Sequence, residues 1–188
     1  MTSVQIDSTD GSEIVAVSEI KTYARIETSA DDSIVTILQS ASRTACEDYL
    51  NRDIVAKTRT YFRSNIPLSS GDYSGLYQDN YKIVLPFAPI ASITSVETEK
   101  SDSTFTSVSY EKYGKDDKYI LLKGSNHTNI KIVYVTAGMN TSALKLAILQ
   151  LAATYYDNRS DFIVGKNADV IPTSIQTILD PYKYISDI

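Results

Sequence analysis

The residues of this sequence that could take part in chemistry are one histidine, one cysteine and a few neighbouring carboxylates. His127 lies in a loop of Gly, Ser and Asn, with no pattern that supplies the oriented carboxylate of a Ser-His-Asp triad. One histidine and one cysteine cannot build a typical zinc site. The sequence also lacks the phosphate-binding glycine loop, the dinucleotide-binding glycine motif and the Gly-x-Ser-x-Gly elbow. We therefore expect no catalytic, metal-binding or cofactor-binding residues, and a protein that is not an enzyme.

The remaining reactive groups have structural explanations. Asp31 and Asp32 fall at the expected start of a helix, where negative charge is favourable. Asp116 and Asp117 lie between two lysines in a segment with turn composition, as expected for a solvated hairpin tip. Cys46 falls inside a helical pattern, where a buried thiol behaves as a small hydrophobic residue.

Composition limits the possible partners. The chain has 188 residues, a net charge of -5 and a pI of about 4.9, which argues against a surface that grips DNA. One cysteine excludes an intramolecular disulfide. The first residues, MTSVQIDSTDGSE, have neither the basic nor the apolar region of a signal peptide, and no apolar run is long enough to cross a bilayer. We expect no membrane partner.

Helical patterns occur at both ends of the chain. A short helix is predicted near Ser18, and a long helix from about Asp31 to Leu50, where Asn51 can end it. The apolar stripe predicted for this long helix contains Ile34, Val35, Leu38, Ala41, Ala45 and Tyr49. A nearly uncharged helix is predicted within TSALKLAILQLAATYYD, and a last helix from about Thr173, interrupted at Pro181.

Residues 56–137 have the alternating, β-branched pattern of strands. TRTYFR, SVSYEKYG, KYILLKG and NIKIVYVT each predict a strand, and two more are expected at about 81–85 and 92–99, separated by PFAPI. The segments YGKDDK and GSNHTN have the composition of hairpin turns.

These patterns predict an α+β fold. It is a bundle of about four helices with an antiparallel β-rich module inserted between the second and third long helices. The expected boundaries are a flexible N-terminus at 1–13, a helical core at 14–55 and 138–181, the β-rich module at 56–137 and a tail at 182–188.

Four segments, in this order, resemble the phage head-tail connector proteins of the gp6-like group, which are adaptor or head completion proteins. They are VSEIKTYARIETSADDSIVTILQSASRTACEDYLNR, IVLPFAPIASITSVE, IKIVYVTAGMNTSALKLAILQLAATYYDNRSD and IPTSIQTILDPYKY. The chain departs from the family at Asn140–Thr141–Ser142, where members usually carry a proline, and in a larger β-rich module.

The resemblance implies a structural virion protein that forms a ring of identical subunits, usually twelve, below the portal. Such a ring extends the DNA channel and joins the capsid to the tail. The implied partners are further copies of the chain, the portal protein, and a next ring, head completion or tail protein. DNA would pass without specific binding. The implied location is the capsid vertex, after assembly in the host cytoplasm.

Two sets of residues are candidates for these contacts. The uncharged helix has one apolar stripe suited to its own core and a second stripe that we predict to lie at the subunit interface: Leu146, Leu149, Ala153 and Tyr156. The chain end carries apolar and aromatic side chains that we predict to bind the portal: Tyr182, Tyr184, Ile185 and Ile188. The alternatives are that the uncharged helix is covered by its own chain, and that the tail folds back on its own subunit.

A different functional class also fits the β-rich composition. The module of residues 56–137 could belong to a β-rich phage or cell-surface binding module of the adhesin or baseplate type, which is not enzymatic either. Such a protein would be monomeric or trimeric with an aromatic glycan-binding cleft, whereas a connector forms a large ring. A hydrolase is disfavoured by the missing catalytic residues.

Overall fold

The structure is a computed structural model that describes residues 2–64, 80–99, 104–114, 119–123, 129–158 and 171–184. The chain divides into two compact units, each made of two chain segments. One unit combines Met1–Gly11 with Ala56–Gly138, and the other combines Ser12–Val55 with Met139–Ile188. The fold is α+β, with a β-rich unit inserted between the second and third helices, as the sequence predicts.

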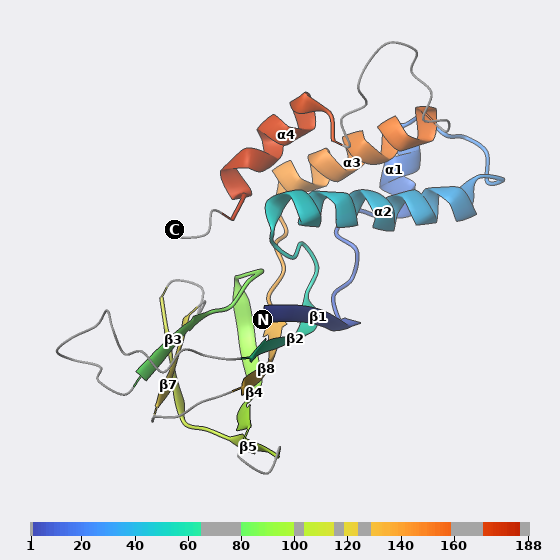
Figure 1. Ribbon diagram of the computed structural model, residues 1–188. Coiled ribbons are helices and arrows are strands. Elements are labelled where there is room, and N and C mark those ends of the chain that lie inside the picture. Colours follow the sequence, from blue (N-terminus) through green and yellow to red (C-terminus); the bar gives the residue numbers. More distant parts are fainter. Residues whose placement is uncertain are drawn as a thin grey trace. The chain divides into compact units, whose positions relative to one another are not determined.

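The described part of the second unit is helical (Figure 1). Its elements are α1 (Val17–Tyr23), α2 (Asp32–Leu50), α3 (Ser142–Asp157), α4 (Thr173–Leu179) and a 3-10 turn η2 (Asp180–Tyr182). The predicted end of α2 is confirmed: Asn51 adopts the left-handed conformation at φ 52°, and its N–H donates to the Glu47 carbonyl. At the start of α3, the Thr141 hydroxyl accepts a hydrogen bond from the Leu144 N–H at 3.3 Å.

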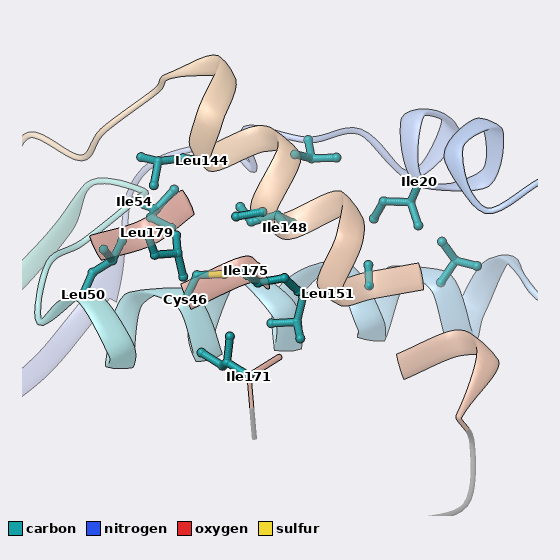
Figure 2. Packing of buried hydrophobic residues seen from close by; sticks show 14 of the residues in the cluster. Ile20, Cys46, Leu50, Ile54, Leu144, Ile148, Leu151, Ile171, Ile175 and Leu179 are labelled. Carbon is teal, nitrogen blue, oxygen red and sulfur yellow. The ribbon is translucent and has the colours of Figure 1, made fainter. Parts of the chain in front are cut away.

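One hydrophobic cluster holds this helical unit together (Figure 2). Its large, fully buried members include Ile20 from α1, Leu50 from α2, Leu151 from α3 and Leu179 from α4. Cys46 projects from α2 into the same cluster (Figure 2). Because most of the stability of helices in proteins comes from packing an apolar face, this shared burial is what keeps all four folded.

The apolar stripe predicted for α2 is only partly on the buried side of the helix, where Ala45 and Tyr49 pack against the helical cluster. Val35 is its one fully buried member, whereas Ile34 and Ala41 are exposed. The buried face of α2 is instead rotated toward a partly polar set: Val35, Gln39, Ser42, Arg43, Cys46, Glu47 and Leu50. Polar side chains can occupy a buried face when hydrogen bonds satisfy them, so hydrophobicity alone did not identify the centre of the buried face.

The β-rich unit contains two antiparallel sheets. Their described strands are β1 (Thr2–Thr9), β2 (Lys57–Ser64), β3 (Asn80–Val84), β4 (Ile90–Glu99), β5 (Phe105–Ser107), β6 (Tyr110–Tyr113), β7 (Tyr119–Lys123) and β8 (Asn129–Thr136). The larger sheet has the order β1-β2-β8-β4-β5 and the smaller one the order β3-β7-β6.

Residues from both sheets form one core. The central strand β8 alternates strictly, so that Ile130, Ile132, Tyr134 and Thr136 are buried. Ile130, Ile132 and Tyr134 belong to a hydrophobic cluster that also contains Ile83 of β3 and Ile120 of β7. The two sheets are therefore packed on each other and fold as a single unit.

The flexible N-terminus expected at residues 1–13 is not what the structure contains. Thr2–Thr9 forms a strand antiparallel to β2, with Val4 opposite Tyr61 and a bulge between Ile6 and Ser8. Nearly all of its side chains are exposed. The strand therefore depends on backbone hydrogen bonding to β2 rather than on burial, which is why hydrophobic patterning did not reveal it.

The two predicted hairpins have different outcomes. β6 and β7 pair as expected, with Tyr113 opposite Tyr119. β7 and β8 do not pair with each other, because β7 lies between β3 and β6 while β8 lies between β2 and β4. The GSNHTN segment therefore connects strands of two different sheets.

Candidate interaction surfaces

Cys46 is fully buried, and burial raises the pKa of its thiol to about 12. The thiolate is the nucleophilic form of cysteine, so a thiol with this pKa is unreactive near neutral pH. The structure therefore agrees with a packing role. His127, Asp116 and Asp117 lie outside the described residues.

The first carboxylate pair makes contacts within the helical unit. The Tyr156 hydroxyl donates to Asp31 Oδ2 at 2.6 Å, and Lys21 Nζ lies 2.5 Å from Asp32 Oδ1. Among the residues that the structure describes, no group of three or more His, Cys, Asp and Glu side chains could hold a metal ion. In the same part of the chain, no helix is long and apolar enough to cross a membrane.

The structure separates the two stripes predicted for α3. Leu144, Ala147, Ile148 and Leu151 are buried in the helical cluster. The second stripe lies outward to different degrees: Leu146 is 39% exposed, while Leu149, Ala153 and Tyr156 are half-buried.

Leu149 and Tyr156 also pack against the edge of the cluster. Of the four residues predicted at a subunit interface, Leu146 is therefore the most accessible. The assignment of the stripe to an interface stays a prediction.

A second apolar surface lies on the outer side of α2, whose sequence carries more apolar residues than one buried stripe requires. Ile37 is 66% exposed and Ile34 is 39% exposed, and the exposed Ala41 continues the same stripe. We call Ile34, Ile37 and Ala41 the α2 outer stripe. The signal that could have revealed it is the helical spacing of Gln39, Arg43 and Glu47, which share a face with the buried Cys46 and Leu50.

Three of the four buried polar residues on the inner side of α2, Gln39, Arg43 and Glu47, are held by specific hydrogen bonds, whereas the buried Ser42 hydroxyl makes none with the described residues. Gln39 Nε2 donates to the Val15 carbonyl at 2.5 Å. Arg43 Nε donates to Glu13 at 2.9 Å, and Arg43 Nη1 donates to Glu47 Oε2 at 2.5 Å. Burial without such partners would cost several kcal/mol (order of magnitude). This network is what allows α2 to turn its polar side inward and its apolar stripe outward.

The chain end lies against the helical unit as far as it is described. The Tyr184 N–H donates to the Leu50 carbonyl at 2.8 Å, and the Arg52 guanidinium lies 5.7 Å from the centre of the Tyr184 ring. Tyr182 packs against the helical cluster. Ile185 and Ile188 lie outside the described residues.

The terminal turn is tied to α2 by two further contacts. The Tyr49 hydroxyl donates to Asp180 Oδ1 at 2.6 Å, and Lys183 Nζ lies 4.1 Å from the centre of the Tyr49 ring. The hydrogen bond to Asp180 raises the pKa of Tyr49. Up to Tyr184, the chain end therefore contacts its own subunit, and the predicted portal contact of Tyr182 and Tyr184 stays a prediction.

Solved structures with the same fold come from gene transfer agent particles, either from the neck or from the virion. A chain from the "Neck of empty GTA particle computed with C6 symmetry" aligns with a TM-score of 0.67 and 16% identity, covering 99% of this chain and 97% of that chain. A chain from the "Virion of native gene transfer agent (GTA) particle" aligns with a TM-score of 0.64 and 15% identity, covering 98% of this chain and 97% of that chain. A chain from the "Neck of native GTA particle computed with C12 symmetry" aligns with a TM-score of 0.58 and 14% identity, covering 96% of this chain and 97% of that chain.

At these identities, the solved structures establish the fold alone. No curated protein sequence matches the chain significantly. The family comparison is more direct, because the head completion protein family matches residues 13–185, which span both compact units. The chain belongs to the head completion protein family, and is thus a phage head-tail connector protein.

Proposed function

We propose that this head completion protein forms a closed ring between the portal and the tail, so that DNA passes through the centre of the ring. The match to the head completion family over residues 13–185 is the observation that carries this proposal. The similarity to chains from particle necks that were computed with C6 and C12 symmetry supports a ring, and the family resemblance supports twelve subunits. The protein works by filling interfaces rather than by catalysing a reaction.

The second stripe of α3 is the proposed site of subunit contact. Leu146, Leu149, Ala153 and Tyr156 form an outward surface on a helix whose opposite face already fills the core. In a ring, each subunit has a neighbour on two sides, so a helix at the side of the subunit can bury both faces. The partly exposed Leu146 is then covered by the adjacent copy.

DNA passes this ring without being bound tightly. The chain carries a net charge of -5, and a channel wall that held phosphates strongly would slow packaging and ejection. At physiological salt we expect no submicromolar binding (order of magnitude) to duplex DNA. A fluorescence-anisotropy titration with short duplexes measures this directly.

The chain end is the proposed portal contact. Tyr182 and Tyr184 lie against their own unit, so they would orient the terminal segment, and Ile185 and Ile188 would reach the portal. The opposite end of the ring would dock the next ring, head completion or tail protein. Assembly would take place in the host cytoplasm.

Ring formation is tested by analytical ultracentrifugation and negative-stain images of the full chain, alone and bound to portal-bearing heads. A ring with a central hole in either sample supports the proposal. A trimer or monomer in both, at the concentrations of assembly, contradicts it.

Portal binding is tested by comparing two truncations in a pull-down with purified portal. Removing residues 185–188 should abolish retention while leaving the Tyr184–Leu50 hydrogen bond in place. Removing residues 181–188 should also abolish retention and additionally lower the melting temperature, because Tyr182 packs on the helical cluster. Full retention of both truncated chains would place the portal contact elsewhere on the subunit.

A further inference from the structure

The α2 outer stripe is unusual because the solvent-facing side of this helix carries no charge along most of its length. Between Asp32 and Asp48, the charged residues of α2 are Arg43 and Glu47, and both are buried. A helix that faces water normally directs its charges outward and its apolar residues inward. Depletion of charge around exposed large apolar side chains is instead typical of the centre of a protein-protein interface.

The α2 outer stripe has the same spacing as part of the second stripe of α3. In α2, Ile34 and Ile37 are followed by Ala41; in α3, Leu146 and Leu149 are followed by Ala153. Each stripe therefore places a large residue at position i, another at i+3 and an alanine at i+7. Both span about 10 Å along their helix, at 1.5 Å per residue.

The two stripes fit each other when the helices lie antiparallel. The alanine at the end of one stripe then faces the first large residue of the other, so Ala41 lies opposite Leu146 and Ala153 lies opposite Ile34. Large side chains filling the space over small ones is how helices interdigitate at close distance. Lys145 and Asp157 are the only charged residues of α3, so a contact along this stripe buries little charge.

The two stripes lie on different sides of the helical unit. The inner faces of α2 and α3 both contribute to the same hydrophobic cluster, so the exposed Ile34, Ile37 and Leu146 point away from it, while Leu149 packs against its edge. A ring needs two different, mutually complementary surfaces on each subunit, because a head-to-tail contact never pairs a surface with itself. One chain carrying two such stripes meets this requirement.

We propose that the α2 outer stripe docks, antiparallel, on the Leu146–Leu149–Ala153 stripe of the next copy of this chain. The inference rests on the proposed ring and adds the surface that forms it. It assigns an interface role to Ile34, Ile37 and Ala41.

The test is cross-linking between engineered thiols in the assembled protein. The double variant Ala41→Cys/Leu146→Cys places one thiol on each stripe at positions that the proposed docking brings together. Treatment of rings, or of portal-bearing heads carrying the variant, with a short bis-maleimide should give a ladder of covalent multimers. Wild-type protein gives the background, because Cys46 is fully buried.

Matched variants separate this arrangement from others. Each single variant should give no multimers, because a head-to-tail contact brings no two identical positions together. Thr36→Cys/Leu146→Cys should also give none, since Thr36 is exposed on a different side of α2. Dimers from Ala41→Cys alone would overturn the proposal by showing that α2 pairs with itself.

A charge substitution tests the same surface without cross-linking. Ile37→Asp should remain folded by circular dichroism, since Ile37 is exposed, yet assemble at least about tenfold more weakly at each contact. Normal rings from Ile37→Asp would overturn the proposed contact but not the proposed ring. The same holds if Ala41→Cys/Leu146→Cys assembles into rings that give no ladder of multimers. Wild-type protein that forms no ring, alone or on heads, overturns the proposed function and this contact with it.

Discussion

Arg43 and Glu47 lie one turn apart on α2, and Arg43 Nη1 donates to Glu47 Oε2 at 2.5 Å inside the helical unit. The other oxygen of Glu47 accepts hydrogen bonds from the backbone N–H groups of Ile54 and Val55, at 2.8 and 3.2 Å. One buried carboxylate thus fixes both the inner face of α2 and the segment that leaves the helix. The pair stabilises the rotation of α2 that turns Ile34 and Ile37 outward.

The first prediction is that Glu47→Ala destabilises the protein by about 3–5 kcal/mol, because it removes the acceptor of Arg43 Nη1 and of two backbone N–H groups, and leaves Glu13 as the remaining carboxylate beside the buried guanidinium. Asp48→Ala is the matched control on the exposed side of the same helix and should change stability by no more than about 0.5 kcal/mol. Urea unfolding followed by circular dichroism measures both. Equal, small effects would mean that the network does not hold α2 in place.

The second prediction contrasts two leucines of α3. Leu151 is fully buried in the helical cluster, so Leu151→Ala should cost about 2–5 kcal/mol of unfolding free energy. Leu146→Ala should change the stability of the isolated subunit by no more than about 0.5 kcal/mol, because Leu146 lies on the outer stripe. Its effect should appear as weaker assembly in sedimentation. A large loss of subunit stability from Leu146→Ala would assign this residue to the core instead.

Element types and order could be predicted from the sequence because the strong patterns are local. The end of α2 at Asn51, the start of α4 at Thr173 and the strand over NIKIVYVT all follow from caps and periodicity. The inserted β-rich unit follows from the change of pattern near residue 56.

Three features could not be predicted, because each depends on contacts between distant residues. The inner face of α2 is polar because Val15 and Glu13 supply partners for Gln39 and Arg43. β1 exists because β2 offers it a free edge. The division of β7 and β8 between two sheets depends on which strands they pair with, and the turn between them carries no such information.

The third prediction concerns alkaline pH. Burial raises the pKa of the Cys46 thiol from 9.0 to about 12, so above pH 9.0 the unfolded chain loses a proton that the folded chain keeps. The folded state then binds more protons than the unfolded state. The contribution of the thiol to the free energy of unfolding should therefore be fully present below pH 9.0 and be lost as pH rises toward 12. The slope is at most about 1.4 kcal/mol per pH unit for this one group.

Urea midpoints of wild type and Cys46→Ala, measured across this range, isolate the contribution of the thiol. The variant should be less stable overall and yet show a shallower loss with pH. Some loss should remain, because burial also raises the pKa of Tyr155. Identical pH slopes in the two proteins would contradict the assignment of the effect to Cys46.

The last prediction concerns the attachment of β1 at acidic pH. Asp10 accepts hydrogen bonds from the Ser8 hydroxyl to Oδ1 and from the Thr58 hydroxyl to Oδ2, each at 2.6 Å. These bonds, with that of Ser8 the largest cause, lower the pKa of Asp10 from 3.8. The charged carboxylate is therefore favoured in the folded state. Its stabilising effect should be present above pH 3.8 and disappear as pH falls through the lowered pKa.

Because β1 buries little side-chain surface, this loss should be local and leave the rest of the β-rich unit folded. Amide chemical shifts of β1 and of Thr58 should change together in an NMR titration, while those of the central strand β8 stay constant. In Asp10→Asn the transition should be absent, and β1 should be loosened at every pH. A transition that persists in Asp10→Asn would show that another carboxylate holds the N-terminal strand, with Asp7 the first to examine because it accepts a 2.6 Å hydrogen bond from the Thr60 hydroxyl.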